Sequence, residues 1–213
     1  MSETSPLLLR IAQEFGEAVI ATHSFRGDDT ATVRRESILE VLRFLKETPE
    51  LGFEMLTDVT AVDYLKYRST DTPGPAFLAH EFLAREREPQ SARFSVVYHL
   101  YSLTHNRRIR LKVPVEESDA AVPSATPLWP IADWLEREVW DMFGIKFVGH
   151  PDLRRILTYE EFEGHALRKD YPLRKRQPLA PTREGWEWAA DQTVSFPKTD
   201  RFDAMPPSKR ERE

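Results

Sequence analysis

The most regular pattern of apolar and polar positions lies between Phe94 and Val115, where two alternating runs follow one another. A turn at His105-Asn106-Arg107 separates the two runs. A period of two predicts a β-hairpin with one buried face. The second run places three basic residues on the opposite face, at Arg108, Arg110 and Lys112.

Apolar residues spaced three and four apart predict three helices. The first begins at Ser5-Pro6, where serine can cap the helix and proline fits its first turn, and it ends near Gly16. The second runs from about Ala31 to Lys46, and the third runs from Ile131 to Phe143. The apolar stripe of the third helix is expected at Ile131, Leu135, Val139 and Met142.

Two further strands are predicted over residues 18–25 and 53–65, and the order of all these elements indicates the fold class. The fold class is α+β: a two-layer domain with helices on one face of a mixed sheet, followed by a long extended C-terminal arm. We place the domain at residues 1–157, with an insertion over 66–93 that contains a short helix at about 76–88. Residues 158–213 are rich in proline and charge and form the arm.

Composition narrows the chemistry that this chain can carry. The 213 residues have a net charge of -5, which does not favour general nucleic-acid binding, and they include no cysteine. A cysteine-free chain cannot supply a disulfide, a thiolate-bound zinc or iron-sulfur site, or a thiol nucleophile. The sequence also lacks a P-loop, a dinucleotide-binding glycine motif and a nucleophile elbow. It therefore favours an assembly subunit over an enzyme.

The predicted third helix carries the densest group of charges. Asp133, Arg137 and Asp141 stand four residues apart and share one helix face. Two interpretations are open: a solvated face with weak ion pairs, or charges that serve a buried interface. Metal binding or acid-base catalysis by Glu136 and Glu138 with Asp141 is disfavoured. A di-iron bundle needs a histidine three residues after its glutamate, and Asp141 stands there instead.

A run of basic residues follows residue 150 and is accompanied by several aromatic residues. Three interpretations are open: RNA binding, a solvated tail, or an arm docked on an acidic partner. The high proline content favours the docked arm. The basic residues are Arg154, Arg155, Arg168, Lys169, Arg174, Lys175 and Arg176. Further on, Trp186 and Trp188 either fold back on the domain or anchor an interface.

Several ordered stretches together resemble the C subunit of the proton-pumping NADH:quinone oxidoreductase, respiratory complex I. The most specific are EREVWDMFGI at 136–145 and GHPDLRRIL at 149–157. Further similarity lies at 58–64, 96–100, 122–130 and 164–173, so that the resemblance covers about residues 30–175. Ala166 stands where the family usually has proline, which predicts a slightly less stiff arm at that point.

The resemblance implies a non-catalytic subunit of the peripheral arm, on the cytoplasmic side of the bacterial inner membrane. FMN and iron-sulfur clusters would be carried by partner subunits, and the complex would pass electrons from NADH to quinone while translocating protons. The implied neighbours are the D, B and I subunits, with membrane association through the complex and no nucleic acid. The alternatives are an equivalent subunit of a membrane-bound hydrogenase or ferredoxin-linked complex, a stand-alone RNA-associated protein and a hydrolase.

The resemblance also implies that the functional residues form an interface, and no catalytic, cofactor or metal residue is expected. Residues 150–157 would turn the chain out of the domain. Charges at Arg154, Arg155, Arg168 and Asp170 would then pair with a neighbouring subunit. The expected interface and motif residues are Glu136, Arg137, Glu138, Asp141, Phe143, Gly144, His150, Pro151, Asp152, Arg154, Arg155, Arg168, Asp170, Tyr171 and Pro172.

Overall fold

The computed structural model describes residues 5–65, 92–172, 174, 175 and 177. These residues belong to one compact unit that spans residues 1–177. The predicted helix at 76–88, most of the predicted insertion, and Trp186 and Trp188 lie outside the described residues.

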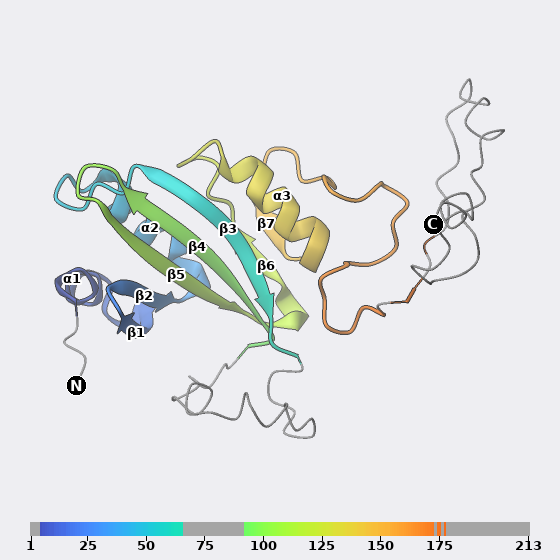
Figure 1. Cartoon of the computed structure of the whole chain (residues 1–213), viewed down its shortest axis with the longest axis horizontal. Helices are drawn as coiled ribbons and strands as arrows, with labels where there is room; N and C mark the ends of the chain where they lie inside the picture. The colour runs from blue at the N-terminus through green and yellow to red at the C-terminus, as the bar shows by residue number, and fades with distance from the viewer. Residues whose placement is uncertain (1–4, 66–91, 173, 176, 178–213) are drawn as a thin grey trace, which may run out of the picture. The chain divides into compact units, whose positions relative to one another are not determined.

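A five-stranded sheet forms the centre of the described chain (Figure 1). Its order is β1 (Val19–Phe25), β2 (Asp28–Val33), β5 (Arg107–Val115), β4 (Phe94–Ser102) and β3 (Met55–Asp63). Neighbouring strands run antiparallel except β2 and β5, which pair in parallel. The sheet is therefore mixed, and the predicted hairpin at 94–115 forms its β4–β5 pair.

The first two strands form a hairpin that the sequence analysis missed. Phe25 pairs with Asp28 across a two-residue loop in which Arg26 has φ 54° and Gly27 has φ 85°. Two successive positive φ values give the turn whose twist matches that of paired strands. The prediction that a helix begins at about Ala31 is wrong, because threonine-rich β2 occupies that stretch and α2 (Ile38–Glu47) begins later.

Three α-helices occur in the part of the chain that the structure describes: α1 (Pro6–Phe15), α2 and α3 (Ala132–Phe143). The α1 start is as predicted, with the Ser5 Oγ accepting a hydrogen bond from the Leu7 amide at 3.3 Å. At the end of α3, Gly144 adopts the left-handed conformation with φ 76°. Short 3-10 turns are η1 (Gly16–Ala18), η2 (Arg35–Ser37) and η4 (Glu117–Asp119), and β6 (Ala121–Pro123) pairs in parallel with β7 (Lys146–Val148).

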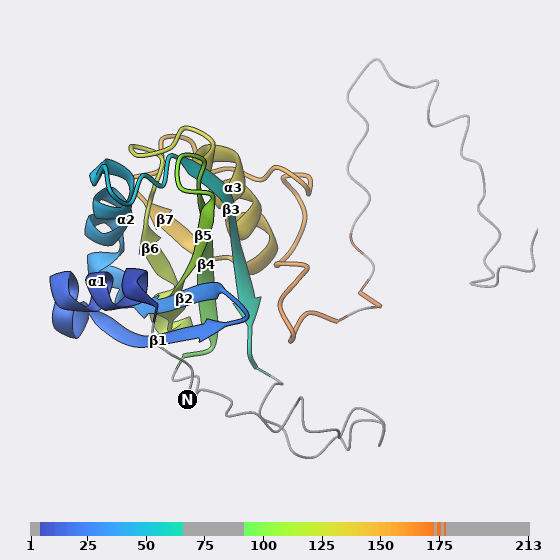
Figure 2. The ribbon, with the colours of Figure 1, turned by 60° about the vertical axis from the view of Figure 1, so that its left-hand side comes forward.

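The helices share one hydrophobic core with one face of the sheet. Buried residues of α1, α2 and α3 belong to the same cluster as Phe94, Val96 and Tyr98 on β4. Side chains at alternate positions of a strand point to the same face, so the helices pack on the face that carries these residues. Figure 2 shows α2 and the β6–β7 pair beside the long strands β4 and β5.

Helix α3 buries more of its surface than the predicted apolar stripe. Val139 and Met142 lie in the core as expected, but Ile131 is 51% exposed. The buried face of α3 includes Glu136 and Asp141, each with 0% exposure. Arg137 is also buried, with 9% exposure. The interpretation of Asp133, Arg137 and Asp141 as a solvated helix face is therefore wrong, because two of the three are buried and need partners inside the protein.

Candidate interface around helix α3

The carboxylate of Asp141 is the most heavily hydrogen-bonded side chain near α3. It accepts bonds from the amides of Ile156 at 3.1 Å, Leu157 at 2.9 Å and Thr158 at 2.8 Å, from the Arg155 guanidinium at 2.6 Å, and from the Thr158 hydroxyl. Burial alone would raise the pKa of Asp141, but the bonds from Thr158 and Arg155 outweigh it and lower that pKa to about 2. Asp141 therefore holds the backbone of residues 156–158 as a charged group.

Arg137 holds the same stretch of chain from one helical turn away. Its Nε donates to the carbonyl oxygen of Arg154, and a terminal nitrogen donates to that of Arg155, both at 3.1 Å. Arg155 in turn donates to the carbonyl oxygens of Phe162 at 2.8 Å and Gly164 at 3.1 Å. The chain after residue 150 is thus bound along α3, and we call residues 150–172 the return segment.

Glu136 fixes the opposite side of α3 to the loop before it. Its carboxylate accepts hydrogen bonds of 2.6 Å from the Ser124 hydroxyl and from the Ala125 amide. Despite these bonds, burial raises the pKa of Glu136 to about 7. The Tyr98 hydroxyl is also buried, and within the described residues it has no hydrogen-bond partner.

His150 begins the return segment with its side chain buried against α3. Its Nδ1 accepts a 3.0 Å bond from the Asp152 amide, so the other ring nitrogen carries the proton and donates to the Asp133 carbonyl oxygen at 3.1 Å. Asp152 pairs with Arg154 at 2.8 Å in an exposed ion pair. Pro151 and Glu138 are exposed.

The middle of the return segment, residues 165–168, contacts the C-terminal end of α3. The Nδ1 of His165 lies 2.9 Å from the Asp141 carbonyl oxygen, and the Leu167 amide donates to that of Met142 at 3.1 Å. Arg168 donates to the Phe143 carbonyl oxygen at 2.6 Å. These contacts satisfy carbonyl groups that the end of a helix leaves without partners.

A second charged cluster fixes the return segment to the sheet. Arg93 pairs with Asp63 at 3.0 Å and with Asp170 at 2.8 Å, and it also pairs with Glu117. Asp63 accepts a further bond from the Lys169 amide at 2.9 Å. The Arg93 partner lowers the pKa of Asp170. Sequence analysis missed Arg93 because that residue fell within the predicted insertion.

The final part of the return segment is held by aromatic contacts. The rings of Phe162 and Tyr171 are stacked, with centroids 5.9 Å apart. A Cβ at Gly164 would lie 3.2 Å from the Tyr171 ring, so this position favours glycine. Pro172 is exposed.

The structure therefore brings most of the predicted interface residues together, but with partners in the same chain. Arg155 and Asp170 were expected to pair with a neighbour, and within this chain they pair with Asp141 and Arg93. Residues 150–157 lie along α3, so the expectation that they turn the chain out of the domain is wrong. Contact between these residues and another subunit remains a prediction.

Large apolar side chains are exposed on and beside the return segment. Exposure is 62% for Leu157, 51% for Leu167 and 59% for Trp134 on α3. The backbone amides of Leu157 and Leu167 are fixed by hydrogen bonds, so these side chains are presented from a well-defined backbone. Of these three, Trp134 is of a residue type that is enriched in protein interfaces.

The carboxylates of Glu136 and Asp141 are engaged in hydrogen bonds within this chain. Both oxygens of Asp141 are occupied, Glu136 is buried under the 124–126 loop, and Glu138 is exposed. Among the described residues, no group of three or more potential ligand residues is placed to bind a metal ion.

Comparison with known proteins identifies the family. Residues 31–177 match the family described as "Respiratory-chain NADH dehydrogenase, 30 Kd subunit". This chain belongs to that family. It is 42% identical to the NADH-quinone oxidoreductase C subunit of Citrifermentans bemidjiense, over 88% of this chain and 98% of the relative. The corresponding protein of a Roseiflexus species is 45% identical over 80% of this chain and 85% of the relative.

One solved structure supports the same assignment, and a second shows the fold. A trypsin-resistant fragment (1–134) of Nqo5 is 33% identical, with a TM-score of 0.53, and the match covers 69% of this chain and 97% of the fragment. A chain of an archaeal membrane-bound sulfane sulfur reductase shares the fold with a TM-score of 0.57 at 17% identity, over 92% of this chain and 94% of that one. The prediction that this chain is the C subunit of an NADH-quinone oxidoreductase is confirmed.

The family assignment makes this chain a subunit of a respiratory oxidoreductase complex. Its match reaches Gln177, so it includes α3 and the whole return segment. In the described part of the chain, no helix has the length and apolar character needed to cross a membrane.

Proposed function

We propose that this chain is a non-catalytic subunit of the peripheral arm of complex I and supports the assembly of that arm. In this proposal the arm passes electrons from NADH through FMN and iron-sulfur clusters to quinone, and the complex couples this transfer to proton translocation. All of these cofactors belong to partner subunits. A chain without cysteine cannot supply the thiolates that usually hold iron-sulfur clusters.

The observation that carries the proposal is the exposure of Leu157 and Leu167 on a segment that α3 holds in place. An interface formed by a preorganised segment avoids most of the entropy cost of ordering it on binding. Obligate interfaces are rich in apolar contacts, and Trp134 beside this segment adds a large aromatic group. The return segment and the exposed face of α3 that carries Trp134 therefore form the proposed docking surface.

The proposed partners are the D, B and I subunits of the same arm, on the cytoplasmic side of the inner membrane. The charge pairs within the return segment support a protein partner over RNA. Arg155, Arg168 and Lys175 donate to groups of this chain, and Arg154 pairs with Asp152, which leaves these cations less available to phosphates.

The relatives favour NADH as the electron donor of the complex. Those at about 40% identity are named as the C subunit of NADH-quinone oxidoreductase, whereas the sulfane sulfur reductase chain shares the fold at 17% identity. We therefore favour the NADH-linked complex over an equivalent subunit of a hydrogenase or ferredoxin-linked complex.

The docking surface is tested by Leu167→Asp in the complete complex. We expect this variant to co-purify poorly with the other subunits and to lower NADH:quinone activity of membranes, because a charge would enter an apolar contact. Leu9→Asp on α1 is the matched control, since Leu9 is 49% exposed and Leu167 is 51% exposed. The purified Leu167→Asp chain should unfold at the same temperature as the parent chain. Normal co-purification of Leu167→Asp would contradict the proposed docking surface.

A further inference from the structure

The sheet face opposite the helices carries a row of cations along β5. Cross-strand register places Arg108 beside Tyr101, Arg110 beside His99 and Lys112 beside Val97. Arg108 is exposed, while Arg110 and Lys112 are half-buried. Within the described chain, none of these three cations has a hydrogen bond or an ion pair from its side chain. We call Arg108, Arg110 and Lys112 the β5 cation row.

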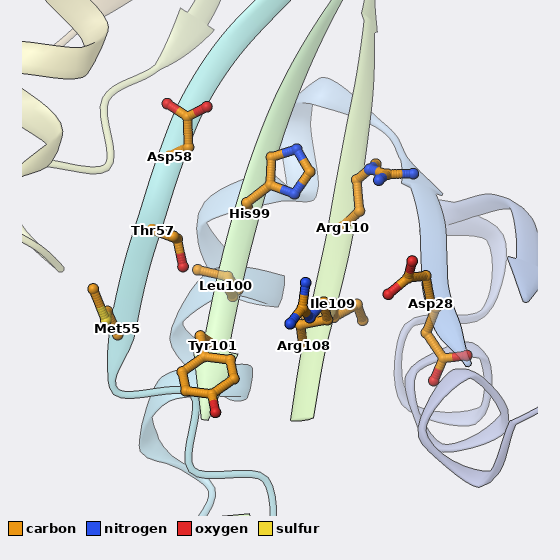
Figure 3. A pocket seen from close by; sticks show the side chains of 11 residues that line it. Asp28, Met55, Thr57, Asp58, His99, Leu100, Tyr101, Arg108, Ile109 and Arg110 are labelled. Atoms are coloured by element: carbon orange, nitrogen blue, oxygen red, sulfur yellow. The ribbon is translucent and has the colours of Figure 1, made fainter. Parts of the chain in front are cut away.

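The row borders a hollow in this face. The cavity has a volume of about 500 Å³, and its lining includes Met55, Thr57, His99, Tyr101, Arg108 and Arg110 (Figure 3). Met55 is 46% exposed, and Thr57 is exposed. The same lining includes the carboxylates of Asp28, Asp29 and Asp58. The hollow therefore combines charged residues of both signs with apolar and aromatic surface.

Acidic residues stand on both sides of the cation row. Asp28 lies on β2 and Asp58 lies on β3, beside His99 in the register of the sheet (Figure 3). Burial and the nearby Arg110 lower the pKa of His99, which favours its neutral form. The positive strip is thus one strand wide.

We propose that this open face binds an acidic, extended segment of another subunit of the same complex, with its carboxylates along the β5 cation row. The inference rests on the proposed function, since it takes the partner from the same assembly. Alternate residues on one strand are about 7 Å apart, and alternate carboxylates of an extended segment have the same spacing. Arginine binds carboxylates through paired hydrogen bonds, which adds direction to the charge attraction.

The flanking acids favour this occupant over a polyanion. A nucleic acid or an anionic membrane presents charge over a broad surface and would bring phosphates close to Asp28 and Asp58. A single extended segment presents one line of carboxylates and can place other side chains near the two acids. The aromatic Tyr101 and apolar Met55 would contact its remaining side chains.

Photo-cross-linking in the assembled complex identifies the occupant. A photoreactive phenylalanine analogue introduced at Thr57 should cross-link to an acidic segment of another subunit, identified by mass spectrometry. The same analogue at Glu40, a position on α2, is the control and should not capture that segment. Capture of this chain itself, of a second copy, or of no protein at Thr57 would overturn the proposal.

Charge variants test the cation row separately. Arg108→Glu combined with Arg110→Glu should reduce retention of the subunit in the complex by about threefold or more, and the reduction should depend on salt. Replacement of both by lysine should preserve most of the retention. Arg10→Glu with Arg43→Glu changes the net charge equally on exposed helix positions and should have no effect.

The outcomes separate this inference from the proposed function. If Leu167→Asp releases the subunit while the double glutamate variant is retained normally, the open face does not bind a partner and the assembly role stands. If neither variant has an effect, both proposals fail. Unchanged thermal unfolding of the purified double variant confirms that any loss of retention reflects binding.

Discussion

The Arg155 guanidinium lies 2.6 Å from the Asp141 carboxylate, and the same carboxylate binds three successive backbone amides after Arg155. One buried acid on α3 thereby fixes the start of the return segment. Arg155 was expected to contact a neighbouring subunit, and in this structure it helps to hold the return segment against its own chain. The exposed Leu157 owes its position to this arrangement.

Asp141→Asn is expected to destabilise the chain strongly. The amide group cannot accept all five hydrogen bonds, and Arg155 loses its charged partner. Removal of one partner of a buried ion pair costs about 3–5 kcal/mol. Urea unfolding of the purified chain measures this cost. Asp152→Asn is the control, because its ion pair with Arg154 is exposed and should be worth no more than about 1 kcal/mol.

Acid should destabilise the chain through the same residue. The pKa of Asp141 is lowered from 3.8 to about 2, so the unfolded chain takes up its proton first as pH falls. The stabilisation is fully present above about pH 4 and is lost towards about pH 2, with a size on the order of 2 kcal/mol. Comparison of unfolding at about pH 5 and about pH 2.5, for the parent and Asp141→Asn, should show a smaller pH dependence in the variant.

Glu136 should have the opposite pH dependence. Burial raises its pKa from 4.5 to about 7, so the folded chain binds the proton more tightly than the unfolded chain. Stability from this group is therefore greatest below about pH 4.5 and declines by on the order of 3 kcal/mol as pH rises to about 8. Glu136→Gln preserves the shape and should flatten this decline in urea unfolding between about pH 5 and about pH 8. An unchanged slope would contradict the assignment.

Gly144→Ala should detach the middle of the return segment from α3. An added Cβ would lie 2.5 Å from the His165 ring, and Gly144 also has φ +76°. Gly149→Ala provides the control, because Gly149 has φ +87° but nothing within 4 Å of an added Cβ. Hydrogen exchange of the Leu167 amide, which donates to Met142, should accelerate more in Gly144→Ala. Equal acceleration in both variants would indicate backbone strain alone.

Arg168→Ala should destabilise the isolated chain as well as affect assembly. Its Nε donates to the Phe143 carbonyl oxygen, and its guanidinium lies 5.1 Å from the centre of the Phe94 ring. Loss of these contacts is expected to cost about 1–2 kcal/mol in urea unfolding. Lys169→Ala is the neighbouring control, since Lys169 contributes its amide to Asp63 and its side chain is exposed. A stable Arg168→Ala chain that fails to assemble would indicate that Arg168 acts mainly on a partner.

The strongest periodic patterns predicted the elements that they belong to. The β4–β5 hairpin alternates over two long runs, and α1 has a serine cap, an early proline and a regular apolar stripe. The β1–β2 hairpin was missed because Arg26 occupies a positive-φ position in its turn, where asparagine or aspartate with glycine is the usual signal. Without that turn, the threonines of β2 merged with the helical pattern of α2.

The sequence by itself determined the α+β class, the absence of thiolate chemistry and, through its ordered motifs, the family. It also identified Asp141, Arg155 and Arg168 as important residues. Only the tertiary structure decided which groups these residues contact. The burial of a charge depends on its partners, which here lie 14 to 25 residues away along the chain. Local spacing sets which residues share a helix face, whereas the packing of distant segments sets whether that face is buried.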